Sequence, residues 1–131
     1  MSFCRRASLA ALPILLLGAL GAAAAAAEGG HQIQHVVLLK WKDGTTPAQE
    51  AEVGAKLMAL KDKIPGVVSI SFGHQSSPEA ATKGHGFDAA ITVVFTDAAA
   101  RDAYLPNPDH QAVVSVLKPL LADLAVVDYT F

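Results

Sequence analysis

A tyrosine and a histidine six residues apart are the side chains in this sequence best suited to chemistry. Tyr104 and His110 bound the run Tyr-Leu-Pro-Asn-Pro-Asp-His. His110 falls in the first turn of a helix that Asn107-Pro108 is expected to open, where the helix dipole disfavours a charged imidazole. A neutral imidazole beside a phenol can remove an acidic C–H proton or polarise a carbonyl. The alternative is structural: His110 holds the bend by a hydrogen bond, and Tyr104 fills the core with its hydroxyl satisfied.

A third candidate is His35, in the predicted strand 33–42. It alternates with apolar residues, so its ring enters an apolar face of the sheet. A histidine in such a place is either an interior group with satisfied hydrogen bonds or part of a cavity wall. We expect His35 to line the cavity if that cavity lies on the sheet face opposite the helices.

The other histidines do not form a metal site by spacing. In an extended strand, four residues put the rings of His31 and His35 about 13 Å apart. His74 and His85 flank a predicted loop over 75–84 and could approach each other, but no cysteine or acidic residue joins them at ligand spacing. We therefore expect no metal and no cofactor.

Other catalytic signatures are missing from the sequence. It has no glycine-rich phosphate loop, no nucleophile elbow and no paired carboxylates. Asp88 and Asp97 are interpreted as a charge at a strand edge and a charge at a helix start.

The first 27 residues predict an export signal. Arg5 and Arg6 precede an uncharged stretch, and the alanines before Glu28 form a small-x-small cleavage site. The alternative is an uncleaved membrane anchor. We expect a signal peptide over 1–27, a flexible tail over 28–32 and a periplasmic or extracellular protein. The single cysteine, Cys4, would leave with the signal, so the mature chain would contain no disulfide.

Charge argues against polyanionic partners. Without residues 1–27 the chain keeps eight basic residues against twelve acidic ones, a net charge of about −4. Nucleic acids and anionic membranes select a surplus of lysine and arginine. We expect no nucleic-acid partner and no stable membrane association once the signal is removed.

Hydrophobic periodicity over 33–131 predicts an α+β domain. Strands are expected at 33–42, 67–74, 87–95 and 124–131, and helices at 47–64, 97–104 and 109–118. This order is a ferredoxin-like βαββαβ protomer with an extra short helix, with an antiparallel sheet and helices on one face. The first strand is apolar on both faces, so a second copy is expected to cover the open face and form a homodimer.

The same residues resemble the stress-responsive dimeric A/B-barrel family. The similarity covers about residues 32–131 and rests mainly on the Tyr104–His110 run and the carboxy-terminal Asp128-Tyr129 strand. It implies a ferredoxin-like protomer whose dimer closes an α/β barrel around a cavity. The family includes a cofactor-free plant polyketide cyclase, in which residues matching Tyr104 and His110 are an acid/base pair. His35 matches a histidine near that pocket, whereas Ala89 stands where the cyclase has another histidine.

Three functions follow from this reading. The first is an exported homodimer that binds a small, partly apolar molecule in the barrel cavity. The second is a cofactor-independent cyclase, lyase or isomerase that uses Tyr104 and His110. The third is a purely structural, oligomerising stress protein. Binding and catalysis require both side chains to converge on one open space, whereas a structural role requires that space to be filled.

Overall fold

The computed structural model describes residues 31–131. The predicted signal peptide, residues 1–27, lies outside the described residues, as does most of the predicted tail. Within residues 31–131, no helix is long and apolar enough to cross a membrane.

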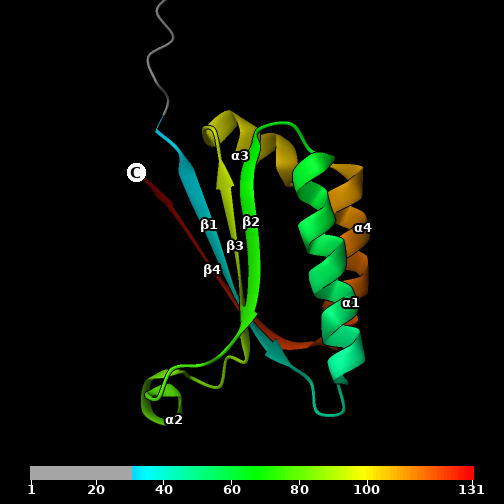
Figure 1. Cartoon of the computed structure of the whole chain (residues 1–131), viewed down its shortest axis with the longest axis vertical. Helices are drawn as coiled ribbons and strands as arrows, with labels where there is room; N and C mark the ends of the chain where they lie inside the picture. Colours follow the sequence, from blue (N-terminus) through cyan, green and yellow to red (C-terminus); the bar gives the residue numbers. More distant parts are fainter. Residues whose placement is uncertain (1–30) are drawn as a thin grey trace, which may run out of the picture.

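Four antiparallel strands form one sheet (Figure 1). The strands are β1 (Ile33–Trp41), β2 (Val67–His74), β3 (Ala89–Phe95) and β4 (Leu121–Thr130). Their order across the sheet is β2-β3-β1-β4, so β1 and β3 are central and β4 is an edge strand. This confirms the predicted ferredoxin-like α+β protomer, including the extra short helix before the last crossover.

The helices of the described chain are α1 (Pro47–Met58), α2 (Ala80–Lys83), α3 (Ala98–Tyr104) and α4 (Pro108–Leu117), with 3-10 turns at Ala59–Asp62 and Lys118–Leu120. The two longest, α1 and α4, pack on one face of the sheet, whereas α2 lies beyond its end (Figure 1). Helices α1 and α4 form the layer over the sheet, and α3 lies at the end where β1 begins. The short helix α2 lies in the segment that was predicted to be a loop.

Local capping explains where the helices begin. Thr46 and Gln49 form a capping box at α1, with Pro47 at the first helical position. Asp97 accepts a hydrogen bond from the Ala100 backbone N–H at 2.8 Å and so caps α3. Asn107 accepts one from the Asp109 N–H at 2.9 Å and caps α4. All three helix starts were predicted from the sequence to within one residue.

The core lies between the sheet and the helix layer. On β1, Ile33, His35, Leu39 and Trp41 are buried there, and Val37 on the same face is half-buried. Along β2, strict alternation would put Val68 on the buried side of the strand with Ile70. A bulge between Val67 and Ser69 shifts the register, so Val67 packs against the core and Val68 is 40% exposed.

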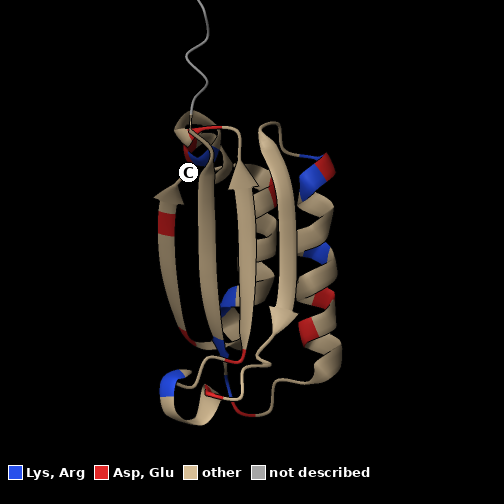
Figure 2. Cartoon of the chain, turned by 60° about the vertical axis from the view of Figure 1, so that its left-hand side comes forward, with Lys and Arg blue, Asp and Glu red and all other residues tan. Residues whose placement is uncertain are grey.

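The opposite face of the sheet carries no helix in the described chain, and few charged residues lie along the strands (Figure 2). Val36 and Val127 are opposite each other across β1 and β4, so both point to this open face. Val127 is 59% exposed. Such a surface is apolar enough to favour association.

Candidate functional site

The bend between α3 and α4 fixes the position and the tautomer of His110. Its Nδ1 lies 3.0 Å from the Leu105 carbonyl oxygen. A carbonyl can only accept, so Nδ1 carries the proton and Nε2 keeps its lone pair. The same carbonyl accepts a hydrogen bond from the Gln111 side chain at 2.6 Å, and the Asn107 N–H donates to the Tyr104 carbonyl at 3.1 Å. The sequence around Pro108 therefore holds a base-competent imidazole in one orientation.

Tyr104 ends α3 beneath this imidazole. Its ring is 1% exposed and lies 4.2 Å from the His110 ring, centroid to centroid, with a 36° tilt. On its other side it meets Phe95 edge-on at 4.9 Å. Burial raises the pKa of the Tyr104 hydroxyl to about 12. The phenol is therefore neutral at physiological pH and can act as a hydrogen-bond or proton donor.

His110 is shifted toward its neutral form. Burial lowers its pKa from the usual 6.5, and the backbone hydrogen bond from Nδ1 opposes that effect. The neighbouring His35 imidazole lowers the pKa of His110 further. The ring is half-buried, so its neutral form dominates at neutral pH.

A hydrogen-bonded network joins His35 to the edge of the sheet. His35 is 8% exposed, and its Nδ1 lies 2.6 Å from Asp128 Oδ1 on the adjacent strand β4. The second Asp128 oxygen accepts a close hydrogen bond from Arg101 of α3, and Arg101 Nε donates to Asp102 at 2.7 Å. Burial disfavours the charged Asp128, but the hydrogen bonds from His35 and Arg101 outweigh it and lower its pKa. Asp128 is therefore an anion that fixes the His35 ring.

His35, Tyr104 and His110 line one cavity of about 280 Å³ between the sheet and α4. Its other lining residues are apolar except for one: Val37, Leu57, Ile91, Val93, Leu105, Val113, Val114, Leu117, Lys118, Leu121, Leu124 and Val126. The structure thus brings together all three predicted site residues. His35 lies on the helix-covered face of the sheet and not on the open face, and this cavity forms within one protomer.

The register of β1 explains why His35 faces the helices. His35 is opposite Val93 and Asp128, and it shares its face with the buried Ile33 and Leu39. In a strand, alternate residues lie on the same face, so His35 must face the helices once Leu39 enters the core. Because both faces of β1 contain apolar residues, the sequence did not indicate which face the helices cover.

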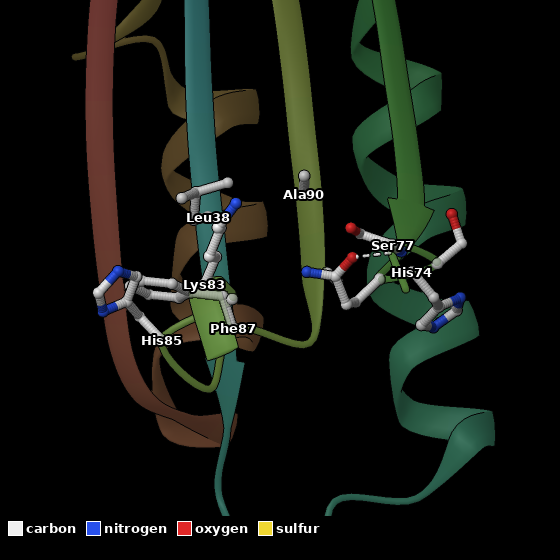
Figure 3. A pocket seen from close by; sticks show the side chains of 11 residues that line it. Leu38, His74, Ser77, Lys83, His85, Phe87 and Ala90 are labelled. Atoms are coloured by element: carbon white, nitrogen blue, oxygen red, sulfur yellow. Dashed lines mark hydrogen bonds between the residues drawn. The ribbon is translucent and has the colours of Figure 1, made fainter. Parts of the chain in front are cut away.

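A larger depression of about 420 Å³ lies at the end of the sheet beside α2 (Figure 3). Its charged and polar side chains include Lys83, His74 and His85. The two histidines lie on opposite sides of it (Figure 3), and His74 Nε2 pairs with Glu50 at 2.7 Å. Lys83 pairs with Glu79 at 2.7 Å. Within residues 31–131, no three histidine, cysteine or acidic residues are placed to hold a metal ion.

Two acidic residues considered in the sequence have structural positions. Asp97 caps α3, and Asp88 accepts a hydrogen bond from the Trp41 backbone N–H at 2.9 Å. Sequence reasoning missed Asp128 and Arg101 as partners of His35. They are 93 and 66 positions from it, and only strand pairing and the packing of α3 bring them near. The one available signal was Asp128, the single acidic residue in the predicted last strand 124–131.

Comparison with known proteins identifies a family and several similar proteins. A family model described as the stress responsive A/B barrel domain matches residues 33–131. An olivetolic acid cyclase from Cannabis sativa is 26% identical over 98 residues, covering 75% of this chain and 95% of the cyclase. A dimeric ferredoxin-like protein of unknown function from Thermobifida fusca is 29% identical, with a TM-score of 0.68 over 78% of this chain and 92% of that one.

A hydroxynitrile lyase from Passiflora edulis shares the fold. Its TM-score is 0.71 at 18% identity, over 77% of this chain and 94% of the lyase.

Proposed function

The chain belongs to the stress responsive A/B barrel domain family, and on that premise we propose that its cavity binds a small, mainly apolar molecule. The observation that carries the proposal is the cavity itself: about 280 Å³, walled by aliphatic side chains, with His35, Tyr104 and His110 at one region of its wall. Binding pockets typically combine apolar walls with a few placed polar groups that orient the ligand. A purely structural protein would fill this space with side chains.

The binding proposal is tested with the neutral fluorescent probe N-phenyl-1-naphthylamine. Its emission should rise with wild-type protein and fall strongly with Val114→Phe, which adds a ring to the cavity wall. Val116→Phe is the matched control, because Val116 is half-buried on the same helix but does not line the cavity. Equal probe binding by both variants and the wild type would place the probe elsewhere and contradict the proposal. Native mass spectrometry of protein purified from its source then identifies any retained molecule.

A second candidate function is acid/base catalysis without a cofactor. The observation that favours it is the Nδ1 hydrogen bond of His110 to Leu105, which leaves Nε2 as a base on a ring stacked against a neutral phenol. In this reaction class, His110 Nε2 takes the proton from a carbon next to a carbonyl, and the Tyr104 hydroxyl hydrogen-bonds to the carbonyl oxygen. The enolate then adds to a second carbonyl, expels a leaving group or is reprotonated elsewhere. The similarity to a cyclase supports this class.

The catalytic candidate is tested with 5-nitrobenzisoxazole, a general probe of bases in apolar cavities. A base removes the C3 proton while the N–O bond breaks, giving a coloured cyanophenolate. Wild type should accelerate this reaction, and His110→Gln should lower the rate by at least about a hundredfold, the lower end of the range ascribed to a positioned base. A His110→Gln protein that is folded and equally active would exclude His110 as the base. Loss of folding in this variant would favour the structural role of the bend.

We further propose a homodimer and an exported location. The apolar open face and the dimeric state of the Thermobifida fusca relative support the homodimer. Export rests on the amino-acid pattern of residues 1–27. It is tested by fractionating cells that express the full chain and by measuring the mass of the protein in the exported fraction. A mature chain beginning near Glu28 is expected, and full-length protein in the membrane fraction would indicate an anchor.

A further inference from the structure

Of the described side chains that line the cavity, Lys118 is the only lysine, arginine or acidic residue. It is the C-cap of α4, and it is exposed. Lys42 adds a second cation at this point, because its Nζ donates to the Pro119 carbonyl oxygen at 2.9 Å. Within residues 31–131, Lys118 forms no ion pair with a carboxylate, and the lysines that do are Lys56, Lys61, Lys63 and Lys83. Lys118 can therefore pair with a ligand.

His110 and Lys118 stand at opposite ends of the cavity. Both lie on one face of α4 with apolar residues between them, and eight residues of helix separate them by about 12 Å. The sheet side of the cavity runs in the same direction, from His35 on β1 to Leu124 on β4. Asp128 is opposite His35, and four residues of strand separate Asp128 from Leu124 by about 13 Å. The cavity therefore has the histidine and tyrosine cluster at one end and a cation at the other.

We propose that the cavity ligand is an amphiphilic carboxylic acid whose carboxylate pairs with Lys118. Its apolar body lies along α4, and a neutral hydroxyl or carbonyl group reaches His110 and Tyr104. This assignment rests on the proposed binding function, and it adds the chemical class of the molecule. A positively charged group at the same end would meet Lys118 with like charge, which is unfavourable.

The cavity opens to water beside β4, at the same end as Lys118. Leu124 lines the cavity and is nevertheless 48% exposed, because β4 is an edge strand that the helices leave partly uncovered. A carboxylate at this opening keeps part of its hydration, so it avoids most of the free-energy cost of burying a charge. The aliphatic stem of Lys118 packs along the apolar wall while its ammonium group stays at the opening.

The acidic residues near this end of the molecule do not compete for the ammonium group. Asp123 is opposite Lys40 across the sheet, so its side chain lies on the open face, away from the cavity. Asp88 accepts a hydrogen bond from the Trp41 backbone N–H and does not line the cavity. Asp43, in the turn after β1, is exposed and does not line it either. The charge at the cavity opening therefore favours an anion.

The test compares 10-hydroxydecanoate with decane-1,10-diol, which has the same chain and a hydroxyl in place of the carboxylate. Both compete with bound N-phenyl-1-naphthylamine at pH 7 and low salt. Lys118→Gln should weaken binding of the acid by about fivefold, the upper range for an ion pair exposed to water, and leave binding of the diol unchanged. Lys118→Arg should keep the wild-type affinity for the acid. Lys61→Gln is the charge-matched control, because Lys61 is exposed and does not line the cavity.

Two results with the acid would overturn the assignment. One is equal binding of the acid by wild type and Lys118→Gln, which would limit Lys118 to stabilising the end of α4, where the helix dipole favours a cation. The other is an equal loss in Lys61→Gln, because the effect would then come from the net charge of the protein. If neither compound displaces the bound probe, this assignment is wrong and the cavity proposal stands. If the probe itself does not bind to wild type, both are wrong.

Discussion

Tyr104 and His110 stack with ring centroids 4.2 Å apart although they belong to different helices. Helix α3 ends at Tyr104, and Asn107 and Pro108 begin α4, so the two rings meet across a capped bend. The His110 side chain closes this bend by its hydrogen bond to Leu105. The structural and chemical interpretations of His110 are thus compatible: the bond that stabilises the bend also selects the tautomer of a base.

The stability of a Tyr104→Phe variant tests whether the Tyr104 hydroxyl has a structural role in the core. Its pKa is raised by burial alone, which indicates a hydroxyl without a stabilising hydrogen bond from the protein. Tyr104→Phe should therefore leave the free energy of unfolding within about 1 kcal/mol of wild type, since no protein partner loses its bond. Urea denaturation followed by circular dichroism measures this. A loss of several kcal/mol would show that the hydroxyl is satisfied in the core and would favour the structural role.

The pH dependence of stability should carry a contribution from His110. Its pKa is lower in the folded protein than the usual 6.5, so the unfolded chain binds the proton more readily. This contribution is fully present above about pH 6.5 and is lost as the pH falls through the lowered folded value. His110→Gln should flatten the decline of stability below pH 6.5. Asp128, whose pKa is also lowered, should leave a separate acid-dependent loss below about pH 4 in both proteins.

Denaturation at a series of pH values checks this prediction. His74→Gln is the control, because this exposed histidine lies away from the cavity, in the depression beside α2. An unchanged slope below about pH 6.5 in His110→Gln would contradict the lowered pKa of His110.

The open face of the sheet should determine association. Val127→Asp places a charge at a residue that is 59% exposed and points away from the helices. Burying an unpaired carboxylate between two sheets is strongly unfavourable, so this variant should sediment as a monomer. Met58→Asp, at a residue 45% exposed in the helix layer, should remain dimeric. A monomeric wild type in dilute solution would contradict the homodimer.

Alanine substitutions at two glycines distinguish the energetic cost of backbone strain from that of a steric clash. Gly66 has φ +83°, and a Cβ there would lie 2.5 Å from the Ala100 Cβ on α3. Gly44 has φ +88°, but no atom lies within 4 Å of an added Cβ. Gly44→Ala should therefore cost about 1 kcal/mol from backbone strain alone. Gly66→Ala should cost at least about 2 kcal/mol, because α3 must also move.

Denaturant unfolding of both alanine variants measures this difference. Equal losses would show that the contact between Gly66 and α3 has no energetic role. Because α3 carries Tyr104 and Arg101, Gly66→Ala is also expected to weaken binding of the apolar probe, whereas Gly44→Ala should not.

Sequence signals that depend only on nearby residues were sufficient to predict much of the fold. The caps at Thr46, Asp97 and Asn107 set the helix starts, because each cap needs only residues two or three positions away. The pairing of Tyr104 with His110 was predictable for the same reason, since a short bend joins them. Alternation predicted the strands, and their order with the helices predicted a ferredoxin-like sheet.

Contacts between distant segments depended on the tertiary structure. Both faces of β1 contain apolar residues, so its sequence did not show which face is buried. The burial of Leu39 in the core beneath the helices places His35 in a cavity within one protomer. The register between β1 and β4 put Asp128 opposite His35, and the packing of α3 brought Arg101 to the same carboxylate. Strand register and helix packing are set by the whole core, so the charge network around the cavity could not be read from any one segment.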